Sequence, residues 1–211
     1  MEKRIFYHPV VEKIARCFSK AFLVGGFVRD RLLNIFKDRV DLDIITFDDL
    51  KKVNNCILKT LKVSSFSFEK EKTVITFFGE NFRIDVSNVK DSLEKDLLSR
   101  DFTINAIAVS INDFSLTDPT NGLKDLKNRI VRPISKESIQ RDPVRIIRGI
   151  RFKHFLGFEY HPTFINYSRL FSKNLENSPI ERVKEELVKI SNVGIFSKAL
   201  KDFDLVGVFV P

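Results

Sequence analysis

The feature that most constrains this chain is a pair of aspartates inside an apolar strand, one helix downstream of a glycine pair. The segment VDLDIIT places Asp41 and Asp43 two positions apart, so both carboxylates lie on one face of the predicted strand. Two like charges this close are unfavourable unless a cation joins them. Two Mg²⁺ ions about 3.5–4 Å apart would do so, and they form the usual site for in-line phosphoryl displacement. The alternative is an exposed strand face with hydrated acids.

The element before the aspartates has the character of a phosphate site. An apolar strand at Ala21–Val24 is followed by Gly25 and Gly26, and then by a predicted helix at Phe27–Asn34. Glycine lets the backbone approach a phosphate closely, and the N–H groups at a helix N-terminus favour an anion. Arg29 adds a guanidinium group for phosphate oxygens. A glycine pair alone could be a tight turn, but beside an Asp-x-Asp strand it predicts a triphosphate site next to a metal site.

A third acid alternates with apolar residues on a later predicted strand. Asp85 lies in the segment FRIDV. On a neighbouring strand its carboxylate could activate an attacking hydroxyl group or complete a metal shell. A polar residue on an edge strand is an equally good interpretation.

Periodicity divides the rest of the chain into a mixed part and a helical part. Strand-like alternation also marks residues 73–78, 82–86 and 104–110, and helical spacing marks residues 9–20, 144–155, 164–171 and 183–190. The sequence Ser178-Pro179-Ile180-Glu181 is typical of a helix start. We therefore predict an α+β fold, with a mixed β-sheet and its helices over residues 1–135 and an all-helical unit over residues 136–211.

Charge and composition point to a polyanionic partner inside the cell. The formal net charge is +8 and the sequence pI is about 9.5. Cys17 and Cys56 show no CxxC spacing, so we expect reduced thiols and neither a disulfide framework nor a zinc site. The three histidines form no ligand pattern. No signal peptide or membrane-spanning run is apparent, which predicts a cytoplasmic protein with no membrane contact.

Five segments together resemble the motifs of the class II tRNA nucleotidyltransferase and bacterial poly(A) polymerase family. They are VGGFVRDRLL followed by DLDIIT, then SRDFTINA, DPTNGLKDL, RDPVRIIRGIRF and PIERVKEEL, in this order over nearly the whole chain. The resemblance implies a head of the DNA-polymerase-β type, a helical neck, Mg²⁺ bound by Asp41 and Asp43, and CTP or ATP as substrate. It implies template-independent transfer of CMP, AMP or both to the 3′ end of tRNA.

The resemblance also implies which other residues meet the nucleotide. The glycine pair with Arg29 and Arg100 matches nucleotide-binding positions, and Asp101 matches a residue near the ribose. The fourth of the segments carries the residues that select the base. Asp142, Arg145, Arg148 and Arg151 recur every three residues, which predicts one side of a helix.

The chemistry of this stripe suits a choice between bases. Cytosine and adenine both present an exocyclic amine beside an unprotonated ring nitrogen. Asp142 can accept from the amine while Arg145 donates to the ring nitrogen, and uracil and guanine reverse both polarities. Arg148 and Arg151 would then meet phosphates or support the pair. A solvated basic stripe is the plain alternative.

The chain departs from the family pattern at three places. Arg141 stands where an acid is usual, and Ser99 where an arginine is common. The segment of residues 86–99 is shorter than the loop that the family carries there, a loop implicated in the switch from C to A addition. We therefore expect that a partial activity, such as C addition alone, is open to this chain. The chain also ends where the family neck ends, so the body and tail that grip tRNA in the family would come either from a partner or from a longer natural chain.

Three other functions compete with this hypothesis. A poly(A) polymerase uses the same machinery, and the motifs do not separate the two. A non-catalytic RNA-binding or assembly subunit is disfavoured because it would need neither Asp41 nor Asp43. A transferase that nucleotidylates a protein is disfavoured by the Asp-x-x-Arg selection motif.

Overall fold

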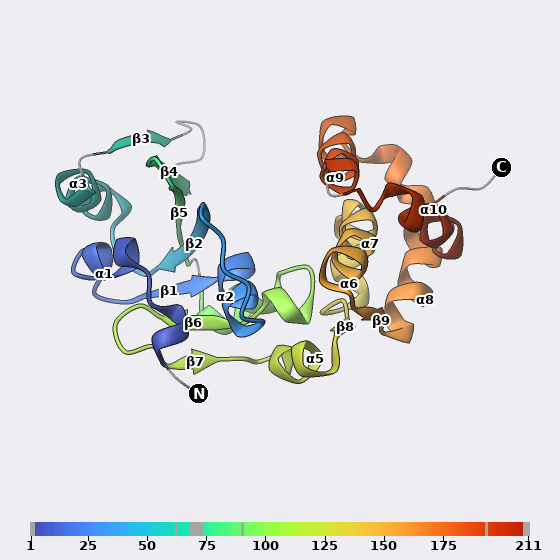
Figure 1. The fold of residues 1–211 in the computed structure, drawn as a ribbon, viewed down its shortest axis with the longest axis horizontal. Helices are drawn as coiled ribbons and strands as arrows, with labels where there is room; N and C mark the ends of the chain where they lie inside the picture. Colours follow the sequence, from blue (N-terminus) through green and yellow to red (C-terminus); the bar gives the residue numbers. More distant parts are fainter. Residues whose placement is uncertain (1–2, 62, 68–73, 90, 193, 209–211) are drawn as a thin grey trace. The chain divides into compact units, whose positions relative to one another are not determined.

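The computed structural model describes the chain except for residues 1–2, 62, 68–73, 90, 193 and 209–211 (Figure 1). The described chain forms two compact units. Residues 1–98 and 105–119 make up the first, which we call the sheet unit; residues 99–104 and 120–211 make up the second, the helical unit. Residues 120–135 thus lie with the helical unit. The boundary near residue 135 between a catalytic head and a nucleotide-selecting neck stays a prediction.

The sheet unit is built on one mixed, seven-stranded sheet in the order β3-β4-β5-β2-β1-β6-β7. Strands β2 and β5 are parallel, and the other neighbouring pairs are antiparallel. The strands are β1 (Ala21–Val24), β2 (Val40–Thr46), β3 (Ser64–Ser67), β4 (Val74–Phe78), β5 (Phe82–Asn88), β6 (Ala108–Ser110) and β7 (Leu116–Thr117). The predicted mixed sheet is confirmed.

Helices lie on both sides of the middle of this sheet. They are α1 (Pro9–Ala15), α2 (Gly25–Leu32) and α3 (Leu50–Leu61); the sheet unit also contains α4 (Leu93–Leu98) and a short 3₁₀ turn at Lys3–Phe6. In Figure 1, α1 and α3 lie on one side of β2 and β5, and α2 lies on the other. The side chain of His8 and the ring of Pro9 start α1, and the carboxylate of Asp49 accepts from the N–H of Lys52 in the first turn of α3.

A disulfide links Cys17, just after α1, to Cys56 on α3. The prediction of reduced thiols is therefore wrong. The two residues are 39 positions apart, yet their Cα atoms lie 5.6 Å apart because α1 packs against α3. That approach is a product of tertiary packing, and no spacing pattern in the sequence signals it.

The helical unit contains α5 (Gly122–Asn128), α6 (Lys136–Arg141), α7 (Val144–Leu156), α8 (Pro162–Phe171), α9 (Ile180–Asn192) and α10 (Phe196–Leu205). A 3₁₀ turn at Ser172–Asn177 joins α8 to α9. The unit is not wholly helical, because β8 (Ile130–Val131) and β9 (Glu159–Tyr160) form a short parallel pair. Phe102, Phe152 and Phe164 pack together in its core. Gly149 leaves room for them, since a Cβ there would lie 2.3 Å from the Phe164 ring.

The ends of the helices and strands show which elements the local sequence pattern predicted correctly. The predicted strands at β1 and β2 are confirmed at both ends, whereas the first helix ends at Ala15 and α2 begins at Gly25, two residues early. Of the strand predicted at 104–110, only β6 forms. Residue 73 of another predicted strand lies outside the described residues. Among the residues described, no helix combines the length and apolarity needed to cross a bilayer.

Candidate functional site

The aspartate pair lies on the more open face of β2. Asp41 is exposed and Asp43 is half-buried. The alternating residues Val40, Leu42 and Ile44 are 5%, 1% and 1% exposed. The predicted division of the strand into an acidic face and an apolar face is confirmed.

The third acid lies beside the pair. Strands β2 and β5 run parallel with Asp43 opposite Asp85 in register, so both side chains leave the same face of the sheet. The hydroxyl of Thr76 donates to Oδ1 of Asp85 at 2.6 Å. Arg83 donates to the same carboxylate through Nε at 3.2 Å and pairs through Nη2 at 2.8 Å. Asp85 is therefore held in place by two neighbours from β4 and β5.

Arg83 was not predicted from the sequence, although the signal was present. It stands two positions before Asp85, so it must share its face. In register it lies opposite Asp41. A cation thus stands within the group of acids, and it balances part of the charge that the aspartates bring together.

The donor set suits a hard divalent metal ion. Mg²⁺ prefers oxygen ligands and is commonly held by one or two protein carboxylates together with substrate phosphates. Asp41 and Asp43 provide such a pair. Among the described residues, no group of three or more acidic, histidine or cysteine side chains is arranged as a metal site by itself.

The glycine turn joins β1 directly to α2. Gly25 has φ of +71°, a left-handed conformation that a residue with a Cβ atom adopts only with strain. The helix begins at this residue, and the preceding Val24 supplies no side-chain cap. Val24 pairs with Asp43, so the N-terminus of α2 lies next to the aspartate strand. The predicted strand–glycine–helix element is confirmed.

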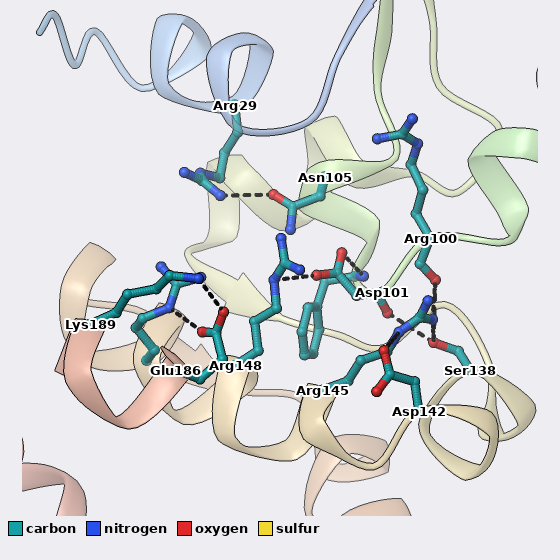
Figure 2. A network of polar contacts seen from close by, with 12 residues as sticks. Arg29, Arg100, Asp101, Asn105, Ser138, Asp142, Arg145, Arg148, Glu186 and Lys189 are labelled. Carbon is teal, nitrogen blue, oxygen red and sulfur yellow. Dashed lines mark hydrogen bonds and ion pairs between the residues drawn. The ribbon is translucent and has the colours of Figure 1, made fainter. Parts of the chain in front are cut away.

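Arg29 lies in the last turn of α2 and is 6% exposed. Its Nε and Nη2 donate to Oδ1 of Asp30 at 2.9 and 2.6 Å. Its Nη1 donates to Oδ1 of Asn105 at 2.8 Å (Figure 2). Lys37 holds the other oxygen of Asp30 at 2.6 Å. Asp30 and Asn105 therefore hold the guanidinium group of Arg29 from two sides. The sequence did not identify Asn105 as its partner, although this residue belongs to the segment SRDFTINA.

In the helical unit, Asp142 and Arg145 lie together at the start of α7. Asp142 precedes the helix, so the prediction that all four selecting residues share one helix is wrong for it; Pro143 separates it from Val144, where α7 begins. The Nε atom of Arg145 is 3.5 Å from Oδ2 of Asp142 (Figure 2). A hydrogen-bond acceptor and a hydrogen-bond donor are therefore adjacent here, whereas their role in selecting a base stays a prediction.

Each member of this pair is also held by other groups. Nη2 of Arg182, on α9, donates to Oδ2 of Asp142 at 2.7 Å, and this bond raises the pKa of Arg182. Arg145 donates to the carbonyl of Arg100 at 2.8 Å and to the hydroxyl of Ser138 at 2.7 Å. Burial lowers the pKa of Arg145. Arg182 lies in the segment PIERVKEEL, and the sequence analysis did not identify it as a partner of Asp142.

The next two arginines of α7 form ion pairs with buried acids. Nε of Arg148 is 2.9 Å from Oδ2 of Asp101, which is 6% exposed. The N–H of Phe102 also donates to that carboxylate. Arg151 donates to Glu186 of α9 at 2.7 Å, and Lys189 donates to the same acid at 2.8 Å. The arginines of the predicted basic stripe therefore form ion pairs, which link α7 to the segment that contains Asp101 and to α9.

The buried Glu186 gives a testable pH dependence. Burial raises the pKa of Glu186, but Arg151 and Lys189 outweigh it and hold the pKa below its ordinary value. A lowered folded-state pKa stabilises the fold above the unfolded-state value and loses this effect as the pH falls through the folded-state value. Glu186→Gln should therefore lower the free energy of unfolding by about 1–3 kcal/mol at pH 7, and by much less at pH 3. Urea unfolding at both pH values measures the difference.

Glu185→Gln is the matched control, because residue 185 is the exposed neighbour on the same helix. It should change stability little at either pH. A Glu186 variant that loses as much stability at pH 3 as at pH 7 would contradict the ion-pair explanation.

The fold and the site together define a class of protein. A mixed sheet with an Asp-x-Asp strand beside a glycine turn and helix N-terminus, followed by a helical unit with an Asp–Arg pair, is the arrangement of a nucleotidyltransferase. The sequence profile of one family, described as the poly(A) polymerase head domain, matches residues 21–91 and 79–132. The chain belongs to the family of class II tRNA nucleotidyltransferases and poly(A) polymerases.

Named relatives agree with this assignment. A CC-adding tRNA nucleotidyltransferase of Halalkalibacterium halodurans is 32% identical over 173 residues, which are 81% of this chain and 44% of the relative. A CCA-adding enzyme of Streptococcus gordonii is 34% identical over 208 residues, or 92% of this chain and 51% of the relative. The chain therefore spans about half the length of the curated relatives it matches.

Solved structures show the same fold. The structure of a CCA-adding enzyme with ATP superposes with a TM-score of 0.86 at 28% identity, covering 96% of this chain and 53% of that one. The Thermotoga maritima CCA-adding enzyme complexed with tRNA superposes with a TM-score of 0.87 at 26% identity, covering 97% and 53%.

Proposed function

We propose that this chain transfers CMP, AMP or both from CTP or ATP to the 3′ end of tRNA, without a nucleic-acid template. The observation that carries the proposal is the aspartate pair of β2 beside the glycine turn at the N-terminus of α2. The relatives named CC-adding and CCA-adding enzymes support the RNA substrate. A tRNA-processing role would place the protein in the cytoplasm.

Catalysis would depend on positioning and charge. Nucleotidyltransferases of this family use divalent metals, and we propose Mg²⁺ held by Asp41 and Asp43. When bound, the ion neutralises phosphate charge and makes the attacking hydroxyl more nucleophilic. The N–H groups at the start of α2, with Gly25 and Gly26, would bind the triphosphate, and Arg29 is oriented to assist them. Asp85 would lie on the side of the attacking 3′-hydroxyl, because β5 flanks β2 opposite to β1.

The helical unit would choose the base. Asp142 would accept a hydrogen bond from the exocyclic amine of cytosine or adenine, and Arg145 would donate to the neighbouring ring nitrogen. Arg182 would keep the carboxylate of Asp142 in place. Arg100 and Asp101 would contact the nucleotide, and Arg148 and Arg151 would support the selecting helix through their acidic partners.

The proposal is tested by a transfer assay. The protein is incubated with Mg²⁺, with tRNA transcripts ending before, within and after the CCA sequence, and with each NTP separately, and the products are sequenced. We expect C or A to be added and U and G to be excluded. Addition of C alone would agree with the short segment of residues 86–99 and with the CC-adding relative. A long A tail would identify a poly(A) polymerase, and RNA binding without any product would contradict an enzyme.

A further inference from the structure

We propose that the open part of the sheet next to Asp85 binds the 3′-terminal nucleotide of the acceptor RNA, with Phe78 stacking on its base and Arg83 meeting its phosphate. The inference rests on the proposed function and names the acceptor subsite of the same site. It is carried by residues of β4, β5 and β2, all of which belong to the sheet unit.

The strand register places the residues of this subsite in one row. Phe78 on β4 lies opposite Arg83 on β5, and Arg83 lies opposite Asp41 on β2. Residues in register on neighbouring strands point to the same face of a sheet, and the strands lie about 4.8 Å apart. Phe78 therefore stands roughly 10 Å across the sheet from Asp41, a distance on the scale of one nucleotide.

The chemistry of the row fits an RNA end. Phe78 is 46% exposed, whereas the adjacent Phe77 on the opposite face is fully buried. The guanidinium of Arg83 lies 5.9 Å from the centre of the Phe78 ring. An exposed aromatic ring beside an arginine is a typical surface for single-stranded nucleic acid, because any base can stack on the ring and the cation meets the backbone.

The geometry of the reaction selects the same side of the aspartates. In phosphoryl transfer the attacking and leaving oxygens lie roughly in line on opposite sides of the phosphorus. The glycine turn that would hold the leaving pyrophosphate follows β1, and β1 and β5 flank β2 on opposite sides. The acceptor hydroxyl must then arrive over β5, where Asp85 and Arg83 lie, with Phe78 one strand further out.

The contacts of Arg83 orient its guanidinium group for binding an RNA phosphate. Its two bonds to Asp85 hold the guanidinium over the sheet, and Thr76 holds the same carboxylate from β4. The cation also offsets the negative charge of Asp85, which would otherwise repel an RNA phosphate. Arg83 is thus a positioning residue as well as a phosphate contact.

Phe78→Ala tests whether Phe78 is the stacking platform, the exposed ring on which the terminal base of the RNA would lie. Phe36→Ala is its matched control. Phe36 is 63% exposed and has the guanidinium of Arg31 4.5 Å from its ring, but it lies outside the sheet.

Stacking on an aromatic ring is worth about 5- to 150-fold in affinity per base. Phe78→Ala should raise the Kd of an RNA minihelix ending in C by that factor, measured by fluorescence anisotropy without nucleotide. It should raise the KM for RNA similarly and leave the KM for CTP unchanged, whereas Phe78→Trp should restore binding.

The outcomes separate this proposal from the proposed function. Equal RNA affinities for the Phe78→Ala and Phe36→Ala variants would overturn the platform, even in an active enzyme. A weakened affinity for CTP in Phe78→Ala, with RNA affinity unchanged, would also overturn it. If the unaltered protein transfers no nucleotide to any RNA, the proposed function fails, while a selective loss of RNA binding in Phe78→Ala would still support the platform.

Discussion

Replacing Asp41 with asparagine should lower nucleotide transfer by about 10³-fold or more, because the variant removes one of two carboxylates available to the metal. Stabilisation of the transition-state charge by a metal ion is worth several kcal/mol, and each 1.36 kcal/mol corresponds to about tenfold in rate. Asp43→Asn should have an effect of the same size. The measurement is the rate of CMP or AMP incorporation at saturating RNA and nucleotide.

Asp38→Asn provides the control for this prediction. Residue 38 is an exposed acid just before β2, so the variant makes the same change of charge outside the aspartate face. It should keep nearly full activity. The thermal unfolding temperature of the Asp41 variant should be unchanged or slightly higher without Mg²⁺, because repulsion among the acids is reduced. Transfer within about tenfold of normal in the Asp41 and Asp43 double variant would rule out the metal assignment.

The second large effect concerns the choice of base. Asp142→Ala should weaken the use of CTP and ATP more than that of UTP, by about 1–3 kcal/mol of discrimination, because it removes the acceptor for the exocyclic amine. The specificity constants for all four NTPs measure this. Arg148→Ala should lower all four together, since Arg148 pairs with Asp101 at the position matched to the ribose site.

The contacts of Asp142 and Arg145 indicate which variant separates the proposed base selection from effects on stability. Arg145 donates to backbone carbonyls of Ser99 and Arg100, so Arg145→Ala should lower stability as well as selectivity. Asp142 is held chiefly by the exposed Arg182, so its removal should perturb the fold less. Equal losses for all four NTPs in the Asp142 variant would refute the base-reading hypothesis without refuting the enzyme class.

Local sequence patterns predicted the strand and turn elements of the site. Alternation of charged and apolar residues predicted both the bounds of β2 and the face on which Asp41 and Asp43 lie. This succeeds because a strand has a period of two and one of its faces must be buried. The glycine pair between an apolar strand and a helix predicted the turn at Gly25, since few other residues adopt its positive φ.

Contacts between distant segments were beyond these patterns. The bond from Arg29 to Asn105 joins residues 76 positions apart, and that from Arg182 to Asp142 joins residues 40 apart. The sequence analysis identified each of these segments as a motif, but it did not predict which side chains contact each other. The short pairing of β8 with β9, and the position of Asp142 before α7, likewise depended on how neighbouring elements pack.

The sequence by itself determined the family, the mixed sheet and the acidic face of β2, because these follow from local periodicity and from motifs of fixed spacing. Only the tertiary structure decided the surroundings of the acids. The parallel pairing of β2 with β5 brings Asp85 beside Asp43 and Arg83 beside Asp41, and the antiparallel pairing of β4 adds Phe78 to that row. Register depends on the free energy of packing whole strands and helices against one another, which no single segment contains.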